Sequence, residues 1–150
     1  MEFICVDIQG FSTPDFEPKE MTIITSNGAA YHYLFRNQIP FMLLSRKHRR
    51  TITWLERNHL GIMYGPEGVE FAQEMFSNFQ DNIIYVKGTQ KKQFMDKYFK
   101  TVVNLEYVDG CPNLCKTTKY CTYHCDYVDS SWSCSYVNCQ LLCYYIVNGL

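Results

Sequence analysis

The stretch that decides the fold is FICVDIQGF, residues 3–11. Its apolar and β-branched side chains are typical of a buried strand. Asp7 stands where the apolar run ends, and Gly10 follows shortly after it. An acid in this place either holds a metal ion or caps a turn, because a buried carboxylate needs a partner. Residues elsewhere in the chain bear on which of the two applies.

The chain has 150 residues, 47% of them apolar, which is enough for one domain with a real core. Its formal net charge of −1 argues against a surface dominated by nucleic-acid contacts. One segment, SRKHRR at residues 45–50, is locally basic and contains Arg46, Lys47, Arg49 and Arg50. These cations are candidate contacts to a phosphate backbone, and the alternative is a solvated loop or helix start.

No stretch approaches about 18 uninterrupted apolar residues, and the amino terminus lacks a basic region followed by a long apolar run. We therefore expect a soluble intracellular protein, cytoplasmic or nuclear, with no membrane partner. A reducing compartment disfavours disulfides, so clustered thiols indicate metal ligands or core residues. Of the eight cysteines, Cys5 stands alone and the other seven lie between Cys111 and Cys143.

Strand and helix patterns alternate along the chain. Strands are expected at residues 3–8, 19–26, 81–88 and 101–108, with an extended, partly looped segment at 29–44. Helical spacing of apolar residues covers 50–62, 65–80, 89–99 and 134–147. The alternation predicts one α/β domain over residues 1–150, in which a Cys/His-rich loop precedes the last helix.

The order of these elements resembles the ribonuclease H-like fold of DEDD-type 3′–5′ exonucleases, a mixed sheet flanked by helices. Those enzymes hold two divalent cations with three aspartates and one glutamate, and a histidine or tyrosine orients the attacking water. Divalent cations of this kind take oxygen ligands, so each acidic position matters. The resemblance implies that Asp7 occupies the first of the four positions.

The first motif of that family, Asp-x-Glu, is incomplete in this chain. It corresponds to Asp7 and Gln9, whose side chains share one face because strand side chains alternate. Gln9 is a neutral amide and cannot supply the missing charge. Glu20 is a candidate replacement partner for Asp7, although its place in the PKE turn favours an exposed side chain.

The other two motifs have also lost their ligands. The helix after the middle strand, where the family has an aspartate, offers Lys91 and Lys92. His-x-Ala-x-x-Asp on the last helix corresponds to Ser133 and Asn138. The resemblance therefore implies a retained fold without the parent chemistry, and leaves Asp7 as a relic of the catalytic site.

A cysteine and histidine cluster precedes the last helix. Cys121 and His124 have Cys-x2-His spacing in the loop, and Cys134 stands at the start of the helix. This spacing allows two thiolates and an imidazole to bind one structural Zn²⁺. Cys5, Cys139 and Cys143 are instead expected to be core residues.

The cluster resembles the Maelstrom domain of the germline small-RNA pathway, an exonuclease-like domain without the catalytic acids that carries a Glu-Cys-His-Cys zinc site. The resemblance implies that Cys121, His124 and Cys134 supply three of the ligands. Local spacing does not identify the fourth, for which Glu56, Glu106 and Cys125 are the candidates.

The sequence therefore predicts a catalytically degenerate, zinc-stabilised, exonuclease-like domain that binds RNA or a protein partner. Two other functions stay open. One is an active metal-dependent nuclease with a rearranged site, and the other is a protein-interaction module without nucleic-acid affinity. If the domain binds RNA, we expect the segment with Arg46, Lys47, Arg49 and Arg50 to contact single-stranded RNA.

Overall fold

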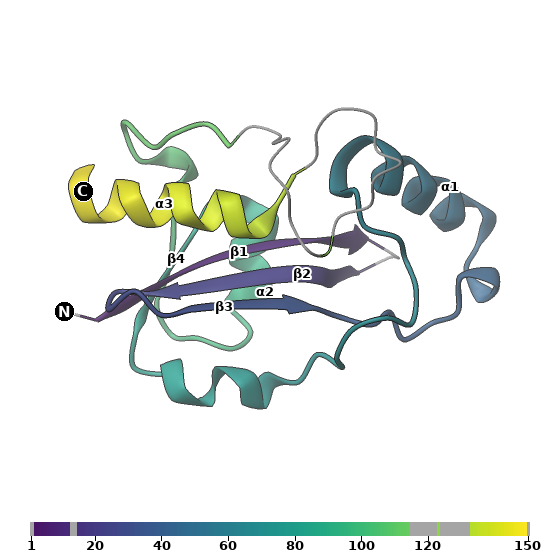
Figure 1. Ribbon diagram of the computed structural model, residues 1–150, viewed down its shortest axis with the longest axis horizontal. Helices are drawn as coiled ribbons and strands as arrows, with labels where there is room; N and C mark the ends of the chain where they lie inside the picture. The colour runs from purple at the N-terminus through teal and green to yellow at the C-terminus, as the bar shows by residue number, and fades with distance from the viewer. Residues whose placement is uncertain (1, 13–14, 115–122, 124–132, 150) are drawn as a thin grey trace.

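The computed structural model describes residues 2–12, 15–114, 123 and 133–149, which form a five-stranded mixed sheet with helices (Figure 1). The strands are β1 (Phe3–Ser12), β2 (Phe16–Thr25), β3 (Ala30–Leu34), β4 (Ile83–Val86) and β5 (Val102–Asn104). The α-helices are α1 (Arg46–Leu55), α2 (Thr89–Met95) and α3 (Ser135–Gly149). The α/β class expected from the sequence is confirmed.

The strands lie in the order β3-β2-β1-β4-β5. β1 and β2 pair antiparallel, as do β2 and β3, whereas β1 with β4 and β4 with β5 pair parallel. Only β2 therefore runs against the other four strands. Parallel neighbours need a crossover connection, and α2 supplies the one between β4 and β5.

β1 lies at the centre of the sheet and is buried on both faces. Ile4, Val6 and Ile8 pack with Phe94, Met95 and Phe99, from α2 and the turn after it. On the other face Cys5 packs with Cys139, Leu142 and Ile146 of α3. The expected core positions of Cys5 and Cys139 are thus confirmed, and Cys143 is half-buried beside them. Because strand side chains alternate, Asp7 and Gln9 point to the α3 face.

α1 lies beyond the carboxyl end of β1 (Figure 1). Ser45 caps the helix by accepting a hydrogen bond from the His48 backbone N–H, which is why the basic segment is a helix start. Ile52 and Leu60 pack against Phe11 at the end of β1. A π-helical turn, Glu56–Leu60, continues α1 and ends at Gly61, which has a φ of 65°.

The helix expected over residues 65–80 is wrong in its first half. Only Gln73–Phe79 is helical, as a 3₁₀ helix, and Val69 instead forms an isolated parallel bridge with Phe35. Gly68 explains the difference, because it has a φ of 105° and a Cβ there would lie 2.4 Å from the Leu34 carbonyl oxygen. The apolar spacing was real, but the backbone beside β3 has no room for a helix.

The helices of the fold are short or only partly apolar. Within the ranges that the structure describes, none of them combines the length and the apolar character that a membrane span requires.

Candidate functional site

Asp7 is fully buried and its carboxylate accepts three hydrogen bonds. Lys91 Nζ lies 2.5 Å from Asp7 Oδ1. Gln9 Nε2 and Asn138 Nδ2 donate to Asp7 Oδ2 at 2.9 and 3.0 Å. Four side chains from β1, α2 and α3 therefore meet at one point, which we call the Asp7 cluster.

The elements of the sheet explain why the cluster forms. Lys91 is in the first turn of α2, which begins directly after β4, the parallel neighbour of β1. Asn138 is in the first turns of α3, which packs on the same face as Asp7 and Gln9. The ammonium of Lys91 neutralises the carboxylate of Asp7, so the cluster has no net charge with which to hold a divalent cation.

One atom of the Asp7 cluster is not satisfied. Asn138 Oδ1 is buried and, among the residues that the structure describes, is the only buried side-chain nitrogen or oxygen without a hydrogen-bond partner. An unpaired buried acceptor costs about 1–3 kcal/mol. The Asp7 cluster therefore includes one unfavourable feature beside its three hydrogen bonds.

Glu20 lies beside the Asp7 cluster, because it pairs with Gln9 across β1 and β2. Its carboxylate contacts His32 Nε2 at 2.6 Å and accepts a hydrogen bond from the Ser135 backbone N–H at 3.1 Å. Cys134 Sγ lies 3.7 Å from Glu20 Oε2. We call these four residues the Glu20 cluster.

The expected exposure of Glu20 is therefore wrong, since its side chain is fully buried. Glu20 and Thr22 alternate with Met21 and Ile23 in β2, so the two polar residues face α3 and the two apolar ones face the opposite core. That alternation is visible in the sequence, but it shows only that the two polar residues share a face. Burial follows from the packing of α3 over them.

The Glu20 cluster contains Cys134, one of the three zinc ligands expected from the sequence. Cys134 and Glu20 combine a thiol and a carboxylate, donors that Zn²⁺ accepts, within contact of each other. Cys121, His124 and Cys125 lie outside the described residues. Within the described part of the chain, no group of three or more His, Cys, Asp or Glu side chains is placed to hold a metal ion.

Glu56 and Glu106, the two acids considered as fourth ligands, have other partners. Glu56 Oε2 accepts a hydrogen bond from the Tyr64 backbone N–H at 2.7 Å. Glu106 lies on an exposed turn, where its carboxylate is 3.5 Å from the Thr89 hydroxyl. Glu20 is the acid that contacts Cys134, and sequence reasoning had considered it only as a partner for Asp7.

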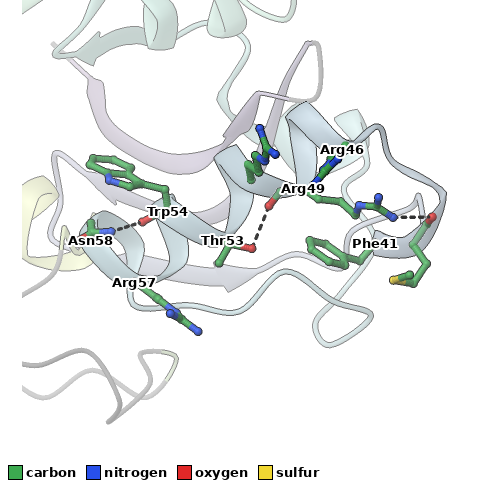
Figure 2. Close-up of a pocket in the computed structure, with 9 residues that line it drawn as sticks. Phe41, Arg46, Arg49, Thr53, Trp54, Arg57 and Asn58 are labelled. Carbon is green, nitrogen blue, oxygen red and sulfur yellow. Dashed lines mark hydrogen bonds between the residues drawn. The ribbon is translucent and has the colours of Figure 1, made fainter.

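The basic segment forms an arginine-rich surface on α1. Arg46, Lys47 and Arg50 are exposed, whereas Arg49 is half-buried and donates to the Met42 carbonyl oxygen at 3.4 Å. Figure 2 shows this surface with Trp54 and Arg57, two residues that sequence reasoning had not included. They lie near the basic segment because side chains three, four, seven and eight positions apart share one side of a helix.

A hollow of about 620 Å³ lies along this surface. Its lining consists of Phe41, Met42, Arg46, Arg49, Arg50, Thr53, Trp54, Arg57 and Asn58. We call it the α1 hollow. It contains none of the residues of the Asp7 cluster, so any binding there is separate from that cluster.

Comparison of the chain with protein-family models, with curated proteins and with solved structures finds no match. The class of protein must therefore be inferred from the fold and the site alone.

Proposed function

We propose that this chain is a catalytically inactive, exonuclease-like domain that is stabilised by zinc and binds single-stranded RNA. The sheet supports the finer fold assignment. The sheet has the order β3-β2-β1-β4-β5 with only β2 reversed, which is compatible with the mixed sheet that the resemblance to ribonuclease H-like domains implies. The position of Asp7 on the central strand agrees with that arrangement.

The Asp7 cluster carries the proposal. The resemblance to DEDD-type exonucleases aligns Gln9, Lys91 or Lys92, and Asn138 with three carboxylate positions of the family. Gln9, Lys91 and Asn138 lie 2, 84 and 131 positions from Asp7 in the chain, and all three contact its carboxylate, whereas Lys92 pairs with Asp96. The convergence of these side chains on Asp7 supports the proposed alignment.

The composition of the cluster argues against catalysis. Two-metal hydrolysis requires several carboxylates to hold the cations and leave open positions for the substrate. This cluster has one carboxylate, two amides and an ammonium, and the ammonium contacts the carboxylate. A divalent cation would have to displace Lys91 and would then find one charged ligand.

Zinc has a structural role in this proposal. Cys121, His124 and Cys134 supply three ligands, and Glu20 supplies the fourth in place of Glu56, Glu106 or Cys125. The contact between Cys134 and Glu20 supports this ligand set. A metal bound there would join β2 to the start of α3 and add its binding free energy to the free energy of folding.

Incubation of labelled single-stranded RNA and DNA with Mg²⁺ or Mn²⁺ tests the loss of activity. We expect no shortening from the 3′ end by the wild-type protein, while RNA is still retained in a binding assay at low salt. The matched control is Asp7→Asn, which removes the one remaining carboxylate of the cluster. Shortening by the wild type that disappears in Asp7→Asn would establish an active nuclease instead.

A further inference from the structure

The surface of α1 carries most of the arginines of the chain. The chain has five arginines, and Arg46, Arg49, Arg50 and Arg57 all belong to α1 or its π-helical continuation. Neither the first turn of α1 nor its exposed side carries an acid, and Glu56 is buried. Among the described residues no carboxylate forms an ion pair with any of these four arginines. This charge is therefore available to an anionic partner.

Large apolar side chains lie exposed beside these arginines. Trp54 is 60% exposed, and Met42 and Leu43 in the preceding turn are 73% and 76% exposed. Ile52 and Leu60 lie on the other side of the same helical segment. They, and not Trp54, are the buried residues that pack against β1. Trp54 is not among the buried core residues, and most of its apolar surface faces solvent.

The spacing along α1 brings the two kinds of side chain together. Arg46, Arg50 and Trp54 follow one another at intervals of four residues, which places them in one row spanning about 12 Å. Arg57 lies three residues beyond Trp54, in the π-helical turn, and its side chain points to the other side of the helix from the indole (Figure 2). Figure 2 shows Trp54, Arg57 and Asn58 at one end of the α1 hollow and Arg46 and Phe41 at the other.

From this arrangement we infer that the α1 hollow is the docking site for single-stranded RNA. The guanidinium groups of Arg46, Arg50 and Arg57 contact phosphates, and an unpaired base stacks on Trp54. The inference rests on the proposed RNA-binding function and deepens it, because it assigns the contact surface and the mode of recognition.

Single-stranded nucleic acid fits this surface better than the alternatives. An exposed indole near cations offers a stacking face, which an unpaired base can use and a base inside a duplex cannot. An acidic protein segment would match the arginines but would leave the indole without a planar partner. RNA is the nucleic acid of the proposed function. Because single-stranded DNA presents the same phosphates and stacking faces, deoxyribonucleotides are a separate arm of the test.

The test measures binding of an unstructured single-stranded RNA, an abasic oligonucleotide of the same length and the matching DNA, each over a salt series. We expect Trp54→Ala to weaken RNA binding roughly 5- to 150-fold, the range for removal of one stacked base. Its effect on the abasic oligonucleotide should be small, because that probe keeps the phosphates and lacks the bases. The salt slope should not change in Trp54→Ala.

The double variant Arg46→Ala/Arg50→Ala should behave differently. It should weaken binding of the RNA and the abasic probe alike, and reduce the salt slope by roughly 0.7 for each phosphate that the variant no longer neutralises. Both substitutions are on an exposed helix surface, where alanine favours the helix. Thermal unfolding of each variant checks that the fold is intact.

Two control variants match these changes on other surfaces. Arg36→Ala removes the fifth arginine, which pairs with Glu70, and Tyr144→Ala removes an aromatic side chain that is 72% exposed on α3. Both should bind RNA as the wild type does. Unchanged binding in Trp54→Ala and in the arginine double variant would overturn the α1 site alone, and tighter binding of the DNA would overturn the choice of RNA. No RNA binding by the wild type at low salt would overturn the proposed RNA-binding function itself.

Discussion

Lys91 Nζ lies 2.5 Å from Asp7 Oδ1, and the side chains of the two residues are 19% and 0% exposed. The pair joins α2 to the central strand across 84 positions of the chain. Asp7 is fully buried, so its carboxylate oxygens find their hydrogen-bond donors in Lys91 and in the amides of Gln9 and Asn138. A buried carboxylate left without its cation is strongly unfavourable.

Lys91→Met should therefore destabilise the protein. We expect the free energy of unfolding to fall by about 3 kcal/mol, the low end of the range for a broken buried pair, because part of the Lys91 side chain reaches solvent. Urea denaturation with a fixed m-value measures this change. The double variant Asp7→Asn/Lys91→Met should lose less than the sum of the two single changes, since the isolated charge is then absent.

Lys92→Met is the matched control, because Lys92 is the next residue of α2 and pairs with Asp96 on the exposed side at 2.8 Å. An exposed pair of this kind contributes at most about 1 kcal/mol, and commonly less. Equal losses of stability in Lys91→Met and Lys92→Met would contradict the role of the buried pair.

Introduction of three acids into the Asp7 cluster should create a metal site. The triple variant Gln9→Glu/Lys91→Asp/Asn138→Asp places four carboxylates around the position now held by Lys91. We expect it to be less stable than the wild type in chelator, because the like charges repel, and to be stabilised by Mn²⁺ through binding to the folded state. Thermal unfolding with and without Mn²⁺ measures the difference. The same Mn²⁺ response in the wild type would show that the Asp7 cluster already binds metal.

The zinc ligand set makes a separate prediction. Protein purified without chelators should contain one zinc per chain, and Glu20→Gln and Cys134→Ser should both lower that content and the unfolding temperature. Cys143→Ser is the control, because Cys143 is half-buried beside Cys139 and should act only as a modest core change. Elemental analysis measures the zinc content, and substoichiometric zinc in the wild type would rule out the site.

Glu56 should make stability depend on pH. Burial raises the pKa of Glu56 above its ordinary value of 4.5, while the Tyr64 N–H bond and the nearby charges of Arg57 and Lys19 oppose that rise. Between pH 4.5 and the raised pKa, the folded state binds more protons than the unfolded state, so stability increases as pH falls through this window.

Relative to Glu56→Gln, the wild type should therefore gain stability as the pH falls from about 7 to about 5. Chemical denaturation at each pH measures the difference. Glu74→Gln, a change at an exposed glutamate, should follow the wild type over the same range. A wild-type protein that instead loses stability relative to Glu56→Gln on acidification would contradict the raised pKa.

The local elements of the fold could be predicted from the sequence. The strand at FICVDI, the turn at Asn27 and Gly28, and the helices of residues 89–95 and 135–147 follow from apolar periodicity and turn residues, which act over a few positions. The helix expected at residues 65–72 was wrong, because the φ of Gly68 and its contact with Leu34 depend on β3, a strand distant in the sequence.

The chemical identity of each site residue was likewise determined by the sequence alone. It shows that Gln9, Lys91 and Asn138 are not acids, and it shows that Arg46, Lys47, Arg49 and Arg50 form one basic segment. Only the tertiary structure decided that those three residues meet at Asp7, that Glu20 is buried against Cys134, and that Trp54 and Arg57 extend the arginine surface. The physical reason is range: side-chain chemistry belongs to one residue, whereas contact depends on strand order and helix packing, which join segments as far apart as β1 and α3.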